Sequence, residues 1–170
     1  MFTKNFDFPF FAQNIADFWK RWHISLSSWF RDYVYVPLGG NRVKLGRWIF
    51  NVLLVFLLSG LWHGANYTFI IWGGLHGLYY LIERFSPVKI RITWLKGTLT
   101  YLSVVFAWIF FRATDFKTAS YIITHLDDGF KEIATNISQG KPAFEYLGIS
   151  KMFALGLILF LETVHYLKSK

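Results

Sequence analysis

The most constraining feature of the sequence is a stretch from Trp48 to Ile82 that holds no Asp, Glu, Lys or Arg in 35 residues. A helix that crosses a bilayer needs roughly 20 apolar residues. The stretch is therefore too long for one core helix of a small soluble domain and is suited to two crossings. Residues 64–66, Gly-Ala-Asn, lie at its middle and are typical of a turn. The sequence predicts a membrane hairpin, with His63 at the end of the first crossing and His76 inside the second.

Composition places the chain among integral membrane proteins. Of its 170 residues 54% are hydrophobic and only 16% are charged, which is not the balance of a soluble domain. The net charge of +8 comes from short basic clusters between apolar runs, which favours contact with membrane lipid and excludes a nucleic-acid-binding face. The absence of cysteine excludes disulfides, thiolate metal sites and a cysteine nucleophile.

Two more apolar runs follow the hairpin. Residues 97–111 form the first run, and the predicted crossing extends back to Ile92. Residues 152–167 form the second, which is apolar except for Glu162 and His165 and makes a weaker crossing. Together with the hairpin these runs predict about four transmembrane helices.

Two further segments complete the predicted architecture. Residues 15–29 have the pattern of a helix whose basic residues keep one side in water, so this helix is interfacial or re-entrant. Residues 112–149 are polar and predict an external loop with a short amphipathic helix over 116–126. The predicted fold class is an all-α, polytopic membrane protein, with residues 1–170 in a single membrane domain.

The basic clusters also predict an orientation. Lys and Arg are enriched in short cytoplasmic loops, and they occur here in residues 42–47, 84–96 and 168–170. These three regions are expected in the cytoplasm, whereas the turn at 64–66 and the acidic residues of 112–149 face outward. The C-terminus is therefore expected in the cytoplasm.

Three histidines, His23, His63 and His76, belong to the apolar or interfacial parts of the chain. The close histidine spacing and neighbouring carboxylate of common metal sites are missing, so no metal is predicted. Removal from water favours a neutral imidazole, which can accept a proton from an alcohol, as acyl transfer to a hydroxyl requires. The alternative is that each histidine only bonds a carbonyl of a neighbouring helix, and for His76 packing is the favoured interpretation. No G-x-S-x-G serine nucleophile motif is present.

Two ordered blocks carry a family resemblance. The segments FWKRWHISLSSWFRDYVYVPLGGNR, residues 18–42, and SGLWHGANYTFIIWGGLHG, residues 59–77, resemble the membrane-bound O-acyltransferase family. Within it the chain is most similar to the bacterial alginate O-acetyltransferase branch, which implies a location in a bacterial inner membrane. The resemblance implies a polytopic enzyme that passes an acyl group from a cytoplasmic thioester through a tunnel to a hydroxyl acceptor.

The same resemblance assigns roles to individual residues. His63 matches the catalytic histidine of the Trp-His-Gly block and is the expected general base. His23 matches the histidine of the Arg-Trp-His block and is expected to position or relay within the tunnel. Arg31 and Asp32 match an Arg-Asp pair, for which a structural ion pair is the expected role. The implied acyl donor is acetyl-CoA as a co-substrate, with no bound cofactor.

The predicted function is O-acetylation of an exported polysaccharide, with an extracytoplasmic acetyl-transfer partner. Similar proteins carry further helices before the segment that matches Phe2, so the chain resembles the C-terminal part of a larger enzyme and is expected to need the missing N-terminal half. One alternative is transfer of D-alanine from a carrier-protein thioester to a cell-wall polymer. Another is a non-catalytic membrane transport subunit whose histidines line a proton path.

Overall fold

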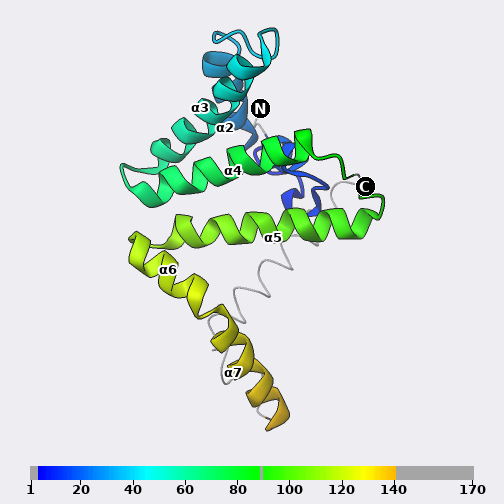
Figure 1. The fold of residues 1–170 in the computed structure, drawn as a ribbon, viewed down its shortest axis with the longest axis vertical. Helices are drawn as coiled ribbons and strands as arrows, with labels where there is room; N and C mark the ends of the chain where they lie inside the picture. The colour runs from blue at the N-terminus through cyan, green and yellow to red at the C-terminus, as the bar shows by residue number, and fades with distance from the viewer. Residues whose placement is uncertain (1–3, 89, 141–170) are drawn as a thin grey trace. The chain divides into compact units, whose positions relative to one another are not determined.

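The computed structural model describes residues 4–88 and 90–140, and within these ranges every regular element is helical, as predicted. The chain divides into two compact units, residues 1–120 and 121–170. Figure 1 shows the elements in chain order: η1 (Pro9–Phe11), α1 (Ile15–Arg21), α2 (Ile24–Phe30), η2 (Arg31–Tyr35), α3 (Leu45–His63), α4 (Tyr67–Phe85), α5 (Thr93–Arg112), α6 (Phe116–Thr124) and α7 (Leu126–Ser138).

The predicted hairpin is confirmed as a pair of antiparallel helices, α3 and α4, joined at residues 64–66, and its two membrane crossings stay a prediction. The two backbones meet at Gly60 and Gly73. A Cβ atom at Gly60 would collide with the carbonyl oxygen of Phe69, and one at Gly73 would collide with that of Phe56. Small residues at helix crossings allow such close approach in membranes. The hairpin therefore depends on glycine at both positions.

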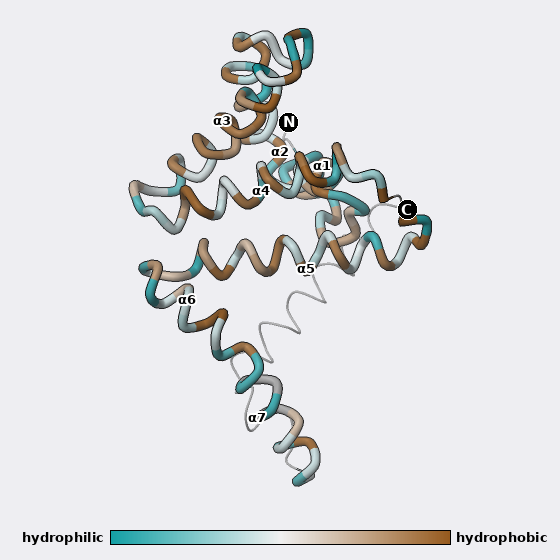
Figure 2. Tube along the Cα trace, in the orientation of Figure 1, coloured by the Kyte–Doolittle hydropathy of each residue, from teal (hydrophilic) through white to brown (hydrophobic). Residues whose placement is uncertain are grey.

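The helix expected for the third crossing is confirmed as α5, which begins at Thr93 and packs along α4. Of the described helices, α3 and α5 are each long and apolar enough to cross a membrane, and Figure 2 shows apolar residues along both. The helix α4 has the same length as α3, but glycines, aromatic residues and a charged end lower its mean hydropathy. The predicted fourth crossing, 152–167, lies outside the described residues.

The predicted continuous helix over 15–29 is wrong at its middle. The helix α1 ends at Arg21 and α2 begins at Ile24, so the chain turns at residues 22–23. Residues 5–7 of the preceding segment cause this break, because the Asp7 N–H donates to the Arg21 carbonyl at 2.9 Å and the Asn5 carbonyl accepts from Ile24 N–H at 2.9 Å. These bonds satisfy backbone groups that helix ends leave without partners.

The core of the first unit lies where α1 meets α4 and α5. Its most enclosed residues come from distant parts of the chain: Ala12, Ile15, Phe18 and Val104, with Trp19, Trp22, Tyr79, Tyr80 and Trp108 packed against them. Glu83 near the end of α4 accepts a 2.8 Å hydrogen bond from the Ile15 N–H, which fixes the start of α1 on that helix. The core thus anchors the short α1 beside the hairpin of α3 and α4.

The polar segment after α5 is more helical than predicted. The amphipathic helix expected over 116–126 corresponds to α6, and α7 follows it directly. Asp115 begins α6 by accepting a 2.7 Å hydrogen bond from the Thr118 N–H, and this backbone bond holds the pKa of Asp115 below its ordinary value.

In the second unit, Lys131 donates to Asp127 at 2.8 Å across one turn of α7. The single membrane domain over residues 1–170 stays a prediction.

Candidate active site

His23 lies at the break between α1 and α2, in a backbone conformation that non-glycine residues rarely adopt. Its φ of 45° and ψ of 54° are left-handed, a region in which histidine is uncommon but enriched over bulkier residues. The Asn5 side chain accepts from Ser25 N–H at 3.0 Å and so supports the turn from outside. Because strained residues persist where the surroundings fix them, the break holds the His23 side chain in one place.

The His23 ring faces aromatic side chains. It meets the indole of Trp62 edge to face, with ring centroids 6.0 Å apart, and lies 6.2 Å from the ring of Phe6. Its Nδ1 atom is buried and has no hydrogen-bond partner among the described residues. A ring nitrogen in that state is available to a substrate or to a water molecule.

His63 is the last residue of α3 and is followed by the turn that starts α4. Gly64 has a φ of 153°, and a Cβ atom there would come within 2.9 Å of the Phe69 ring, so glycine is required after the histidine. Asn66 then caps α4, since its side chain accepts from the Thr68 N–H at 3.2 Å. The same side chain donates to the Thr114 carbonyl at 2.8 Å, which ties the turn to the end of α5.

Aromatic rings from three helices surround the His63 imidazole. Their centroids lie 4.8 to 6.0 Å away, and the rings belong to Trp62, Phe69, Trp72 and Phe111. The ring planes of Trp72 and His63 are perpendicular, at 90°. These four rings shield part of the imidazole from water and fix its orientation.

The two predicted catalytic histidines therefore meet around one residue. Trp62 contacts both the His23 ring and the His63 ring, with ring centroids 6.0 and 4.9 Å away. Trp62 is 58% exposed in the described part of the chain, so this cluster of His23, Trp62 and His63 can be reached from outside the hairpin. The sequence indicated Trp62 as an aromatic neighbour of His63, but it gave no indication that His23 would contact Trp62 or that Phe111 would contact His63.

His76 lies apart from this cluster, in the core of the first unit. Its side chain is fully buried, and Nδ1 accepts a 3.3 Å hydrogen bond from the indole N–H of Trp19. No ring contact joins His76 to His63 among the described residues; the indole of Trp72 contacts both. His76 therefore packs against Trp72, which is one of the four rings around His63.

Arg31 and Asp32 form the ion pair expected of them, with 2.7 Å between Arg31 Nε and Asp32 Oδ1. Both side chains are exposed, and the hydrogen bond between them lowers the pKa of Asp32. An exposed pair of this kind contributes little to stability. Its position in η2, a single π-helical turn after α2, makes it part of the connection between α2 and α3.

Comparison with known proteins decides the family. Residues 3–123 match the membrane-bound O-acyltransferase family, which is more than half of the chain. The chain belongs to the membrane-bound O-acyltransferase family. The match contains His23, His63 and His76, so the residues that form the site all lie within the shared region.

Three named acyltransferases are similar to the chain. The chain is 48% identical over 121 residues to the probable alginate O-acetylase AlgI of Pseudomonas aeruginosa, covering 69% of this chain and 23% of that protein. It is 45% identical over 129 residues to the peptidoglycan O-acetyltransferase of Helicobacter pylori, covering 70% and 24%. It is 36% identical over 121 residues to the teichoic acid D-alanyltransferase of Bacillus subtilis, covering 63% and 30%. The chain thus spans about a quarter of the length of these relatives.

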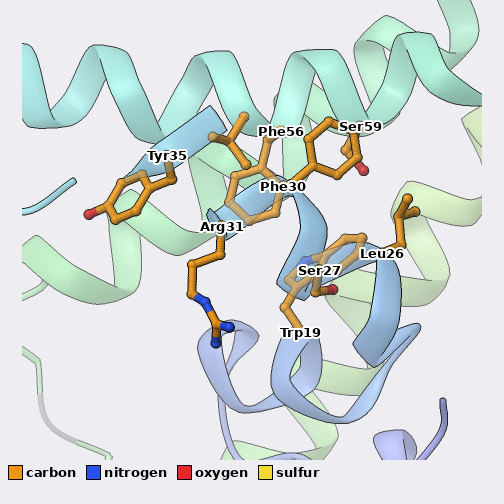
Figure 3. Close-up of a pocket in the computed structure, with 9 residues that line it drawn as sticks. Trp19, Leu26, Ser27, Phe30, Arg31, Tyr35, Phe56 and Ser59 are labelled. Carbon is orange, nitrogen blue, oxygen red and sulfur yellow. The ribbon is translucent and has the colours of Figure 1, made fainter. Parts of the chain in front are cut away.

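An apolar cavity of about 150 Å³ lies between α2 and α3. Figure 3 shows its lining: Trp19, Leu26, Ser27, Phe30, Arg31, Tyr35, Phe56 and Ser59, with Val55 as a ninth residue. Neither predicted catalytic histidine lines it, but Ser59 lies one helical turn before His63. Tyr35 also borders a larger cavity of about 790 Å³ near Arg84 and the start of α3. Cavities therefore follow α3 from its first residues to within one turn of His63.

Proposed function

We propose that the chain carries the catalytic histidines of a membrane O-acyltransferase that moves an acetyl group from a cytoplasmic thioester to a hydroxyl of an exported polysaccharide. The observation that carries the proposal is that the rings of His23 and His63 both contact Trp62, since these are the histidines of the two family blocks. The probable alginate O-acetylase and the peptidoglycan O-acetyltransferase support the choice of acetyl group and polysaccharide.

The proposed reaction needs one base. The acceptor hydroxyl gives its proton to the His63 imidazole while its oxygen attacks the thioester carbonyl carbon. The carbon–sulfur bond then breaks, and the leaving thiolate takes that proton from His63 to become a thiol. The products are an ester and a free thiol, and His63 returns to its neutral form. His23, held by the backbone break, positions the reacting groups beside Trp62.

The cavities along α3 support a route for the donor. The larger cavity is lined in part by Arg84, whose guanidinium suits the phosphate groups of acetyl-CoA. The smaller cavity is apolar and ends near Ser59, which suits the acyl end of the donor. We place the donor along this side of α3, with its thioester directed toward His63 and an extracytoplasmic partner receiving the acetyl group.

The donor distinguishes this proposal from its main alternative. In a chimera, residues 3–123 of this chain replace the matching segment of the Pseudomonas aeruginosa relative. Membranes that contain the chimera are expected to transfer acetyl groups from acetyl-CoA to the polysaccharide, measured with radiolabelled donor. Transfer of D-alanine from an aminoacyl carrier protein, without acetyl transfer, would instead support the D-alanyl transferase alternative that the Bacillus subtilis relative favours.

We also propose four crossings of a bacterial inner membrane, with the hairpin turn outside and the C-terminus in the cytoplasm. The chain has no cysteine, so single cysteines report sidedness directly. Cysteines that replace the exposed Lys44 and Ala65 are expected to react with a membrane-impermeant maleimide from opposite sides. A cysteine at the buried Ser59 is the control and should react only after denaturation. Labelling of positions 44 and 65 from the same side would contradict the topology.

A further inference from the structure

His76 is the most enclosed polar group near the site, and its environment is specific. Its side chain has no exposed surface, and its ring stacks on Phe18 at 6.0 Å and on Phe56 at 6.4 Å. The indole N–H of Trp19 donates to Nδ1. Nδ1 is therefore the acceptor nitrogen, and a neutral ring carries its proton on Nε2. The hydrogen bond fixes both the tautomer and the rotation of the ring.

The rigid His76 ring forms part of the support of Trp72. The two residues lie one turn apart on α4, and their ring centroids are 4.9 Å apart with planes at 72°. Trp72 is 3% exposed, and its indole N–H has no hydrogen-bond partner among the described residues. Because no such bond fixes the indole, its orientation depends on the rings packed against it, namely those of Trp19, His76, His63 and Phe111.

Trp72 also contacts the proposed base, His63. Its ring centroid lies 5.2 Å from that of His63, with perpendicular planes. We propose that His76 is a positioning residue that holds His63 in its working orientation through Trp72, and that Trp19 holds His76 by its hydrogen bond. The inference rests on the proposed role of His63 as the base. A displacement of about 1 Å in such a group can slow a reaction about a hundredfold.

Substitution of His76 by asparagine or by leucine separates positioning from simple filling of space. Asparagine carries Oδ1 on Cγ, where histidine carries Nδ1, so it can accept the bond from Trp19. Leucine fills much of the same volume and accepts nothing. If His76 only fills space, His76→Leu should be the milder of the two changes. If His76 positions Trp72 through the hydrogen bond from Trp19, His76→Asn should be the milder one.

In the chimera, His76→Leu is expected to lower kcat for acetyl transfer about tenfold to a hundredfold, with the KM for acetyl-CoA unchanged. His76→Asn is expected to restore most of the rate. Trp19→Phe should lower kcat as well, and the double variant with His76→Leu should be no slower than the slower single variant, because both remove one interaction. Trp94→Phe, at an exposed tryptophan of α5, is the control and should be unaffected.

A second readout does not require activity. Diethyl pyrocarbonate modifies accessible imidazoles, and mass spectrometry gives the rate at His63 in each variant of the chimera. His76→Leu is expected to change that rate and His76→Asn to return it toward the native value. Equal effects of the two substitutions on both kcat and the His63 modification rate, at equal protein abundance, would overturn the inference. An inactive native chimera would count against the proposed function, and the modification rates would still decide the inference.

Discussion

Replacement of His63 by alanine in the chimera is expected to reduce acetyl transfer at least about a hundredfold, since general base catalysis contributes about 10²–10⁴-fold. The imidazole accepts the proton of the acceptor hydroxyl in the proposed reaction, and four aromatic rings hold it in place. Initial rates with radiolabelled acetyl-CoA measure the effect. His63→Gln, which keeps a polar group of similar reach, is expected to be equally inactive.

The control for this prediction is Leu61→Ala, two residues away on α3 at a side chain that is 45% exposed. Its rate should stay near the native value, and both variants should reach the membrane in equal amounts. Undiminished polysaccharide acetylation by His63→Ala would remove the catalytic assignment. Loss of a transport activity with intact acetylation would support the alternative of a transport subunit.

The hairpin could be predicted from sequence because its signals are local. A long run without charge, a Gly-Ala-Asn turn and basic residues at its ends placed the first helix and the start of the second within a few residues of α3 and α4. The third crossing was predicted for the same reason. The close contact of Gly60 with Gly73 was not predicted, since it depends on the angle at which the two helices cross.

The break at residues 22–23 could not be predicted from the helix itself. The apolar and basic residues of 15–29 follow one helical pattern, and no glycine or proline interrupts it. The chain turns because residues 5–7 supply hydrogen bonds to Arg21 and Ile24. Such competition between a helix and a distant segment is absent from any local pattern.

The site was predicted in part. The family blocks singled out His23 and His63, but two of the side chains that orient His63 lie on other helices, Trp72 on α4 and Phe111 on α5. The four-residue spacing from Trp72 to His76 could have indicated that these rings meet. No spacing rule connects Phe111 to His63, because their contact follows from the packing of α5.

The stability of the hairpin should be most sensitive to the crossing of its two backbones. In the chimera, Gly73→Ala is expected to destabilise the fold by about 3 kcal/mol, the upper end for overpacking, because the new Cβ would meet the backbone carbonyl of Phe56 rather than a side chain that can rotate away. Thermal aggregation in detergent, followed by the soluble fraction after heating, measures the loss as a lowered midpoint temperature.

Gly74→Ala is the matched control, on the same helix and one position later. A Cβ atom there would meet only the Leu57 side chain, at an ordinary 3.7 Å, so its midpoint should stay near the native one. Gly73 also directly follows Trp72, and separation of α3 from α4 would move the indole away from His63. Gly73→Ala should therefore lower acetyl transfer in the molecules that remain folded, whereas Gly74→Ala should not. Equal midpoints and equal rates for the two variants would show that the hairpin tolerates a wider crossing and that the site does not depend on it.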